Sequence, residues 1–441
     1  MGMERRTFLS LLALPVVAQL LQSCGDDTND TNDTGNTTTG GNGVQPAGLK
    51  GSAPRVAPTA NDAAAAASAI NAFSADLFDR LVAADPTANL VFSPASIALA
   101  LAMTSAGAKG TTLTEMNTVL HITDPATIHR SMNGVSTALE SVDKSRDNTT
   151  EGGTGTSEVQ LSIANSLWGQ TGLGFEQAFL DLLSAEYDAG LELVDYATDP
   201  EAARAAINTW VAAQTKDRIP ELLAEGTLTA DARLTLVNAI YLKANWATIF
   251  DKERTTDEPF TAPAGEVTVS MMHITADLDV AEGEGWQAVD LPYVFGDLTF
   301  TAVLADDGTP TPSADEVFAA LGQRKVELGM PRFDIETSTE MSRLLAAMGM
   351  PTAFSDADFS GMTTEDRLVI GAVIHQANIT VDEEGTEAAA ATAVVMGETA
   401  APEPKEPMVL TIDRPFTFWL RDRATGTVIF AGRVNDPSTT R

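Results

Sequence analysis

The chain has 441 residues, and its 61 Asp and Glu against 27 Lys and Arg leave a formal net charge of −34. This charge repels phosphate backbones, so we expect no nucleic-acid partner. The hydrophobic fraction of 44% is enough for a large core and excludes a wholly disordered protein. One cysteine allows neither an internal disulfide nor a cysteine-based metal site. At about 150 residues per domain, the length alone suggests two or three domains.

Residues 1–24 have the pattern of an export signal. A pair of arginines lies within residues 5–9, and the apolar run 8–21 is too short to cross a hydrocarbon core of about 30 Å. Residues 5–9 resemble a twin-arginine signal. Residues 21–24 resemble a bacterial lipobox, after which Cys24 would become the lipid-modified N-terminus. The alternative is an ordinary cleaved signal with an incidental cysteine.

Residues 25–61 consist mostly of Asn, Thr, Gly and Asp, with little apolar surface to bury. This composition predicts a flexible tether. With an acylated Cys24, the tether would hold the following domain off a membrane surface. We therefore expect an exported protein, lipid-anchored on the extracytoplasmic side of a membrane, in the periplasm or at the cell surface.

Residues 62–437 carry the signals of a folded region. Asp62 is expected to cap a first helix, and Ser93 and Pro94 begin a uniformly apolar helix over 95–106 that should be central. Further helices are expected at 111–120, 125–143, 175–186 and 200–214, and a polar, glycine-rich loop is expected at 147–157. Strands are expected at 91–92, 159–168, 191–194, 234–241, 267–272, 298–304, 326–330, 368–381, 417–420 and 427–432.

The order of these elements indicates the fold class. Helices lie mostly early and strands mostly late, which favours an α+β fold over a doubly wound sheet. No internal repeat and no linker-like change of composition divides residues 62–437, although the length suggests several domains.

No motif of a catalytic or cofactor site is present. The histidines are not spaced as metal ligands, and no HExxH, GxSxG, Walker or GxGxxG pattern occurs. The glycine-rich residues 152–155 lack the spacing and the lysine of a phosphate-binding loop, so we expect an ordinary loop there. His121, His129 and His273 lie at helix or strand ends and are expected to be solvated or hydrogen-bonded. We expect no cofactor and no metal, and nothing favours a hydrolase with a dispersed triad.

The segment 379–400 has a distinctive composition. A strand ends at an acidic turn with Gly385, and small or β-branched residues then continue without proline until Pro402. The four alanines at 388–391 fit a piece of helix or a low-complexity loop. Residues 387–396 equally fit a latent strand with alternating faces, because those between Glu387 and Met396 are small or β-branched and the segment includes no proline and no basic residue. Both interpretations stay open on composition alone.

Several stretches together carry a family resemblance. Residues 381–389 resemble the hinge of the serpin family, and residues 89–97 resemble the start of its central helix. Residues 236–246 resemble its long strand that ends in a tryptophan. Residues 412–416 and 430–434 resemble its C-terminal signature. Because the matches follow the family's order over nearly the whole folded part, the chain is identified as a member of the serpin family.

The resemblance implies a single domain over 62–437, with three β-sheets, eight to nine helices and an exposed reactive-centre loop at about 383–407. It also implies an irreversible suicide-substrate inhibitor of serine proteases rather than an enzyme. A protease would cut the loop and form an acyl-enzyme, and the freed loop would enter the large sheet and distort the protease. The target protease would be the covalent partner of a monomeric inhibitor, and the acidic balance disfavours a polyanion cofactor.

The resemblance assigns three groups of site residues. The hinge comprises Glu383, Gly385, Thr386, Glu387, Ala388, Ala389, Ala390 and Ala391. The breach, at the top of the large sheet, comprises Trp246, Arg332 and Glu383. The shutter, beneath the point where the sheet opens, comprises Ser93, Ser96, Asn238 and His375. In the shutter His375 is expected to be a polar latch rather than a catalytic base.

The resemblance also locates the reactive bond. Counting from Glu383 in the family's register places it at Thr399–Ala400, and the long loop leaves Met396–Gly397 and Val395–Met396 as alternatives. All of these residues are small or apolar, which predicts elastase-, chymotrypsin- or subtilisin-like targets. A non-inhibitory serpin acting as a binding or structural protein is the alternative function. Thr386 and the alanines after it favour inhibition.

Overall fold

The computed structural model describes residues 47–59, 61–150, 153–386 and 406–439. They belong to one compact unit, Val44–Arg441, rather than to the two or three domains that the length suggests. The reason is that the long strands run through the unit and share a large continuous core with the helices. Within these ranges no helix is both long and apolar enough to cross a membrane.

The described residues contain eight α-helices, in the range that the resemblance implies. They are α1 (Ala63–Ala84), α2 (Pro94–Ser105), α3 (Gly110–Val119), α4 (Ile128–Glu140), α5 (Gln177–Tyr187), α6 (Pro200–Gln214), α7 (Ala314–Ala320) and α8 (Ser342–Met348), with the 3-10 turns η1 (Lys252–Arg254) and η2 (Pro351–Phe354). All residues of α2 are buried, as its apolar sequence predicts. Asp62 precedes α1, but its carboxylate accepts from the backbone N–H of Thr59 and does not cap the helix.

The strands form two hydrogen-bonded sheets. Their bounds are β1 (Ala47–Leu49), β2 (Leu90–Phe92), β3 (Lys144–Thr150), β4 (Gly153–Gln170), β5 (Leu191–Val194), β6 (Leu234–Asn245), β7 (Thr256–Ala262), β8 (Gly265–Gly283), β9 (Trp286–Pro292), β10 (Leu298–Ala305), β11 (Gly322–Pro331), β12 (Phe333–Glu340), β13 (Ala372–Val381), β14 (Gly385–Thr386), β15 (Met408–Thr411), β16 (Phe416–Asp422) and β17 (Val428–Val434). The first sheet has the order β1-β5-β4-β6-β14-β13-β12, and β3 pairs with β4. The second has the order β15-β11-β8-β9-β10-β16-β17-β2, and β7 pairs with β8.

The resemblance implies three sheets, whereas the described strands form two sheets when every hydrogen-bonded neighbour is assigned to the same sheet. The difference arises at β8, which is 19 residues long. One part of β8 pairs with β7 and β11, and its C-terminal end pairs with β9. This single strand therefore joins two groups of strands into one sheet, and the α+β fold class is unaffected.

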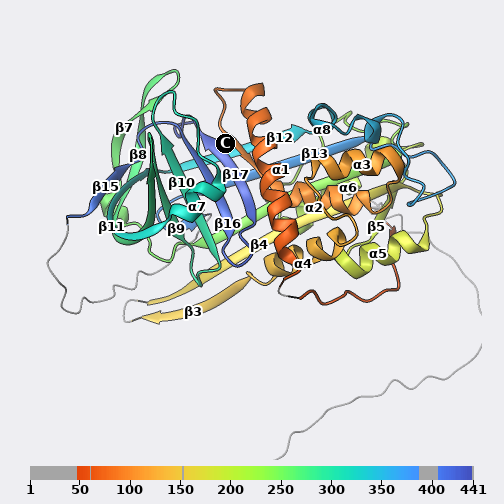
Figure 1. Ribbon diagram of the computed structural model, residues 1–441, viewed down its shortest axis with the longest axis horizontal. Coiled ribbons are helices and arrows are strands. Elements are labelled where there is room, and N and C mark those ends of the chain that lie inside the picture. The colour runs from red at the N-terminus through yellow and green to blue at the C-terminus, as the bar shows by residue number, and fades with distance from the viewer. Residues whose placement is uncertain (1–46, 60, 151–152, 387–405, 440–441) are drawn as a thin grey trace, which may run out of the picture. The chain divides into compact units, whose positions relative to one another are not determined.

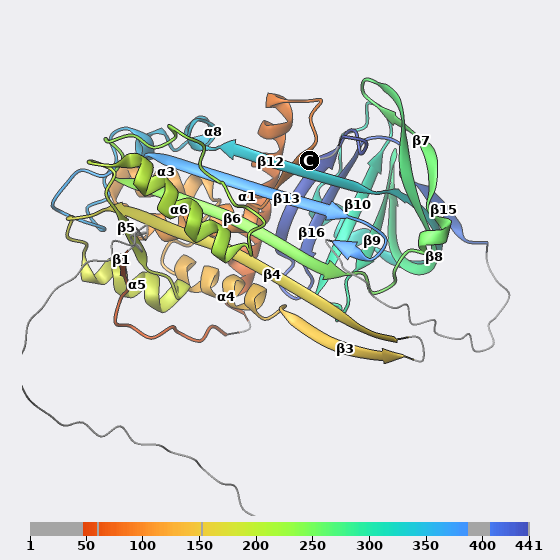
Figure 2. The ribbon, with the colours of Figure 1, turned by 180° about the vertical axis from the view of Figure 1, so that it is seen from behind.

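Helices cover both faces of the first sheet. Figure 2 shows α6 in front of the long strands and α1, α2 and α4 behind them. On the α6 face, Ile207 and Val211 belong to one buried cluster with Trp168 of β4 and Val237 of β6. The sheet is thus the middle layer of three, so a change in its width must move helices as well as strands.

The prediction of a loop at 147–157 is wrong, because the described residues in this range belong to the β3–β4 hairpin. Antiparallel pairing with β6 begins at Val159, and β4 extends beyond that point to Gly153. The overhanging part of β4 pairs with β3 instead. The polar composition suggested a loop, but backbone pairing to an already ordered strand does not depend on apolar side chains.

The tether expected over 25–61 is wrong for residues 47–59. Residues Ala47–Leu49 form β1 at the edge of the first sheet and pair with Leu191–Leu193 of β5. The segment is held by backbone and polar contacts, which leave no apolar periodicity in the sequence. The signal at 1–24, including Cys24, lies outside the described residues, as does the tether up to residue 46.

Candidate functional site

The hinge lies inside the first sheet. Gly385 and Thr386 of β14 pair with Asn245 and Ala244 of β6, and Thr386 also pairs with Val381 of β13. Further along, β6 and β13 pair directly with each other, from Thr235–Ile240 to Ala372–Ala377. The two strands are therefore already parted at one end, and the hinge occupies the opening (Figure 2).

Gly385 is required by the closeness of β6. Its φ of +152° lies in the region that side chains rarely adopt. A Cβ atom at this position would lie 2.0 Å from the backbone oxygen of Ala244. Because that neighbour is backbone, it cannot swing away, and only glycine allows this pairing.

Thr386 is buried beneath an aromatic pair. Its side chain is 1% exposed, and its hydroxyl hydrogen-bonds with the Tyr293 hydroxyl at 2.6 Å. Tyr293 stacks on Trp246 with 4.5 Å between ring centroids. The indole N–H of Trp246 in turn donates to the backbone oxygen of Asp382 at 2.9 Å. The breach tryptophan therefore contacts the turn immediately before the hinge.

The acidic turn is held by two cationic side chains. Arg332 donates to the Glu383 carboxylate, with Nε 2.8 Å from Oε1, and Thr255 donates to the same oxygen. Burial alone would raise the pKa of Glu383, but these hydrogen bonds outweigh it and hold the pKa below its ordinary value. Lys252 forms an ion pair with Glu384. The turn is thus held by these contacts, which favour the charged form of Glu383.

The shutter residues Asn238 and His375 lie in one row across the sheet with Asn165. Asn165 of β4 is opposite Asn238 of β6, and Asn238 is opposite His375 of β13. The Asn238 amide donates to Ser96 Oγ at 2.5 Å and to Asn165 Oδ1 at 2.6 Å. Since Ser96 belongs to α2, the row ties three strands to the central helix.

His375 completes this network. Its Nε2 accepts from the backbone N–H of Ser93 at 3.0 Å, and its Nδ1 hydrogen-bonds with Asn238 Oδ1. These partners fit a neutral imidazole with the proton on Nδ1. The side chain is fully buried, and burial lowers the pKa of His375 to about 3. A buried ring with both nitrogens occupied has the geometry of a latch.

The other histidines have ordinary surroundings. His121 pairs with Asp76, His129 hydrogen-bonds with Tyr187, and His273 pairs with Glu258. Among the residues that the structure describes, no group of His, Cys, Asp and Glu side chains is arranged to hold a metal ion. The polar clusters of this region therefore join strands and turns to one another.

The structure brings together the breach trio, the shutter four and the first hinge residues. The remaining predicted site residues lie outside the described ranges: Glu387, Ala388, Ala389, Ala390, Ala391, Val395, Met396, Gly397, Thr399 and Ala400. Sequence reasoning missed Asn165, Thr255, Lys252 and Tyr293. Only Asn165 left a signal, because it is an amide on the face of the strand whose other residues, such as Ile163 and Leu167, are apolar. The other three depend on contacts between distant segments.

The family model for serpins, serine protease inhibitors, matches residues 68–437. The chain belongs to the serpin family. A serpin-like protein of Thermococcus kodakarensis is 36% identical over 377 residues, 84% of this chain and 85% of that protein. The leukocyte elastase inhibitor of Xenopus laevis is 34% identical over 388 residues, 84% of this serpin and 99% of that protein.

Solved serpin structures are similar to the whole fold. The thermophilic serpin tengpin in its native state has a TM-score of 0.74 at 26% identity, over 89% of this chain and 100% of tengpin. Thyroxine-binding globulin in complex with thyroxine has a TM-score of 0.72 at 28% identity, over 85% of this chain and 99% of that one. The serpin fold expected from the sequence is confirmed. Serpins are generally protease inhibitors rather than enzymes.

Proposed function

We propose that this serpin is an irreversible suicide-substrate inhibitor of elastase-, chymotrypsin- or subtilisin-like serine proteases. The observation that carries the proposal is the position of Gly385 and Thr386, which already pair between β6 and β13. A strand that has started in this gap can continue along the same two neighbours. The residues that follow in the sequence, 387–400, contain no proline and no basic residue that would stop it.

The free energy for trapping a protease would come from completing this strand. The protease serine attacks the carbonyl carbon of the reactive bond, the C-terminal part of the loop leaves, and an ester joins the enzyme to the cut end. Each residue that then enters the sheet gains ladder hydrogen bonds worth about 1 kcal/mol each. Insertion must first separate the direct pairs between Thr235–Ile240 and Ala372–Ala377. Over about ten residues the gain is large enough to pull the acylated enzyme out of shape before the ester is hydrolysed.

The breach and shutter have opposite roles in the proposal. Trp246 and the Arg332–Glu383 pair hold the turn from which insertion starts. The shutter resists, because the bond between His375 and Asn238 joins the two strands that must part. Loop cleavage releases the restraint on the loop, and the shutter then opens. The native state is therefore secured kinetically.

The setting of the inhibitor is also proposed. The pattern at residues 5–9 and 21–24 supports export and a lipid anchor on Cys24, on the extracytoplasmic side of a membrane. We infer a monomer that meets its target protease there.

The test uses purified protein and a panel of proteases. Pancreatic elastase, chymotrypsin and subtilisin are incubated with the protein, and trypsin serves as the disfavoured enzyme. A complex that survives SDS, together with a released peptide beginning at Ala400 by mass spectrometry, is the expected result. Cleavage with turnover and no stable complex for any enzyme would overturn inhibition and favour a non-inhibitory serpin.

A variant separates insertion from simple binding. Thr386→Arg places a charge where the native side chain is 1% exposed, so the loop should be cut without trapping the enzyme. The matched control is Thr229→Arg at an exposed threonine far along the chain, which should inhibit like the natural protein. Equal inhibition by both variants would show that the Thr386 position is not used for insertion.

A further inference from the structure

Residues 47–59 form an N-terminal arm that belongs to the folded unit but lies outside the family model, which begins at residue 68. In Figure 1 its dark red trace runs beside α4 and α5. The arm adds β1 to the free edge of β5. Strand β1 is therefore the edge strand of the first sheet at the end opposite β12.

The first part of the arm binds α5 and β5. Lys50 pairs with Asp188 at 2.5 Å, and the backbone N–H of Ser52 donates to the Asp181 carboxylate at 2.8 Å. A Cβ atom on Gly51 would lie 2.3 Å from the backbone oxygen of Leu180. The arm therefore lies directly against the α5 backbone, with no room for a side chain.

The second part of the arm binds α4 through Arg55. Every side-chain nitrogen of Arg55 donates to a residue of α4: Asn133 at 3.2 Å, Ser136 at 3.2 Å, Thr137 at 3.1 Å and Glu140 at 2.6 Å. The Asn133 amide donates back to the backbone oxygen of Val56 at 2.7 Å. Such a planar, forked guanidinium contact is specific in geometry as well as in charge.

The arm joins the first sheet, at β5, to the helical layer, at α4. Insertion between β6 and β13 divides the sheet into β1-β5-β4-β6 on one side and β13-β12 on the other. The arm is paired to the first group at β5, and it is bonded to α4 in the helical layer. Helix α4 packs closely on α1, since a Cβ atom on Gly134 would lie 2.7 Å from Ala63 N. Moving β5 relative to this layer must strain or break arm contacts.

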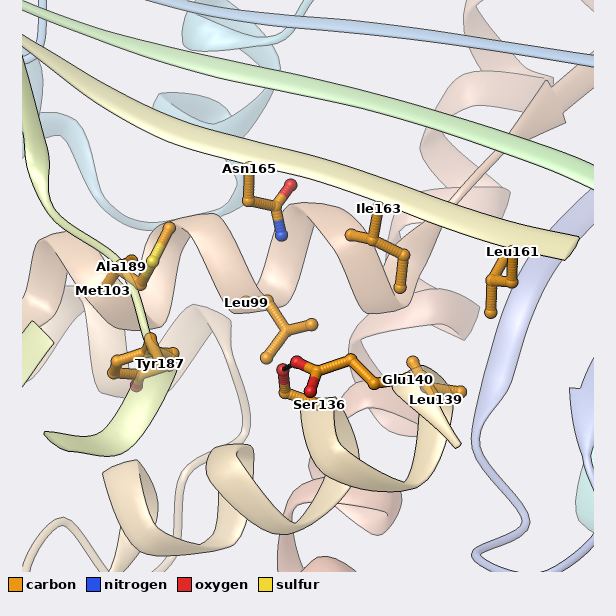
Figure 3. Close-up of a pocket in the computed structure, with 10 residues that line it drawn as sticks. All are labelled: Leu99, Met103, Ser136, Leu139, Glu140, Leu161, Ile163, Asn165, Tyr187 and Ala189. Carbon is orange, nitrogen blue, oxygen red and sulfur yellow. Dashed lines mark hydrogen bonds between the residues drawn. The ribbon is translucent and has the colours of Figure 1, made fainter. Parts of the chain in front are cut away.

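A cavity between β4 and α4 makes the contact of the arm with α4 more important. Figure 3 shows it between β4 and the helices α2 and α4, with Ser136 and Glu140 of α4 on one wall and Asn165 of β4 on the other. Its volume is about 140 Å³. Direct packing of β4 on α4 is therefore incomplete at this point. Arg55 bonds to the same Ser136 and Glu140, so the arm supplies a connection that packing does not.

We propose that the N-terminal arm is a clamp that holds the first sheet closed and sets the rate at which it opens. A contact shifts an equilibrium only when it differs between the two states, and bonds that bridge the moving strands and α4 meet this condition. The clamp rests on the proposed function in that it assumes a sheet that opens. Its test therefore uses sheet opening without any protease.

The experiment measures how fast a fluorescein-labelled peptide with the sequence of residues 386–397 enters the sheet of the full-length protein. Arg55→Ala should incorporate the peptide about five times faster than the natural protein, because it loses the bonds to α4. Arg55→Lys keeps the charge without the fork and should be intermediate. The control is Arg324→Ala, which removes an exposed pair with Glu282 on the second sheet and should change nothing.

Exchanging the charges of Arg55 and Glu140 distinguishes a lost clamp contact from a general loss of stability. Arg55→Glu should be fast, and the addition of Glu140→Arg should bring the rate back toward the natural value. Equal rates for Arg55→Ala, Arg324→Ala and the natural protein would overturn the clamp while leaving inhibition untouched. A peptide that enters none of the proteins would overturn both proposals. If the natural protein traps no protease, but Arg55→Ala still incorporates the peptide faster than the natural protein, inhibition alone would be overturned.

Discussion

Gly385 and His375 act on the same gap from opposite ends. Gly385 allows the hinge to lie against the backbone of Ala244, where a side chain would collide. His375 bonds to Asn238 across the strands that remain paired below. A few atoms therefore decide how far the hinge inserts between β6 and β13 while the shutter keeps these strands paired. Single substitutions at Gly385 or His375 should change this balance.

The latch makes stability depend on pH. In the unfolded chain a histidine has a pKa of about 6.5, whereas burial lowers the pKa of His375 to about 3. Between these two pKa values the unfolded state binds more protons than the folded state. The contribution of His375 to the free energy of unfolding is therefore fully present above pH 6.5, and it falls by up to about 1.4 kcal/mol per pH unit below pH 6.5. We expect a lower thermal midpoint at pH 5 than at pH 7.5.

His375→Gln should reduce this pH dependence, because glutamine does not titrate. Some slope should remain, since burial also lowers the pKa of His129 to about 4. The control is His121→Gln, whose native side chain is 37% exposed and pairs with Asp76. An unchanged difference between the two midpoints in His375→Gln would contradict the assignment of His375 as a buried neutral latch.

At the scale of elements, β14 is the smallest strand and the one on which the proposed function depends. It has two residues, yet it has neighbours on both sides in the middle of the sheet. Pairing with β6 on one side and β13 on the other orders the short strand, whose own length would not. Lengthening it requires only that β6 and β13 part further.

Gly385→Ala tests whether this pairing matters for trapping. The added methyl group collides with the Ala244 oxygen, so β14 should leave the gap and loop insertion should slow. We expect the ratio of cleaved protein to SDS-stable complex to rise at least severalfold. Gly322→Ala is the matched control, because nothing lies within 4 Å of its Cβ position. An unchanged ratio in Gly385→Ala would show that entry does not start there.

At the scale of the whole molecule, the absence of an internal disulfide bond is consistent with a sheet that widens. A chain with one cysteine has no internal disulfide, and the described residues form one unit in which helices cover both faces of the first sheet. Polar contacts such as the arm and the shutter then restrain the sheet. Such contacts can break and reform, which a covalent link cannot do on the time scale of a protease reaction.

Cys24→Ser tests the proposed anchor. Loss of the acylated thiol removes the buried hydrocarbon chains that would hold the protein on a membrane, so the variant should move to the soluble fraction. The neighbouring Ser23→Ala should stay with the membranes. Persistence of Cys24→Ser in the membrane fraction would refute lipidation at this residue.

Sequence reasoning was most successful where a pattern has a local cause. The cap at Ser93 and the apolar run after it predicted α2, and Ser93 indeed accepts from the Ser96 N–H. The motifs at the hinge and the C-terminus identified the family, which the family model over 68–437 confirms. The β3–β4 hairpin was missed because its polar, glycine-rich composition is typical of a loop, whereas backbone pairing between the two neighbouring strands orders it without apolar side chains.

The sequence by itself determined the family, the α+β fold and the residue types at the hinge and shutter, because caps, periodicity and motifs are properties of neighbouring residues. Only the tertiary structure decided that 47–59 are an arm and not a tether, and that Asn165, Asn238 and His375 share one row. The physical reason is that register and long-range polar contacts join residues far apart in the chain. The opening inference from length to several domains failed for the same reason, since the long strands of two sheets run through one folded unit.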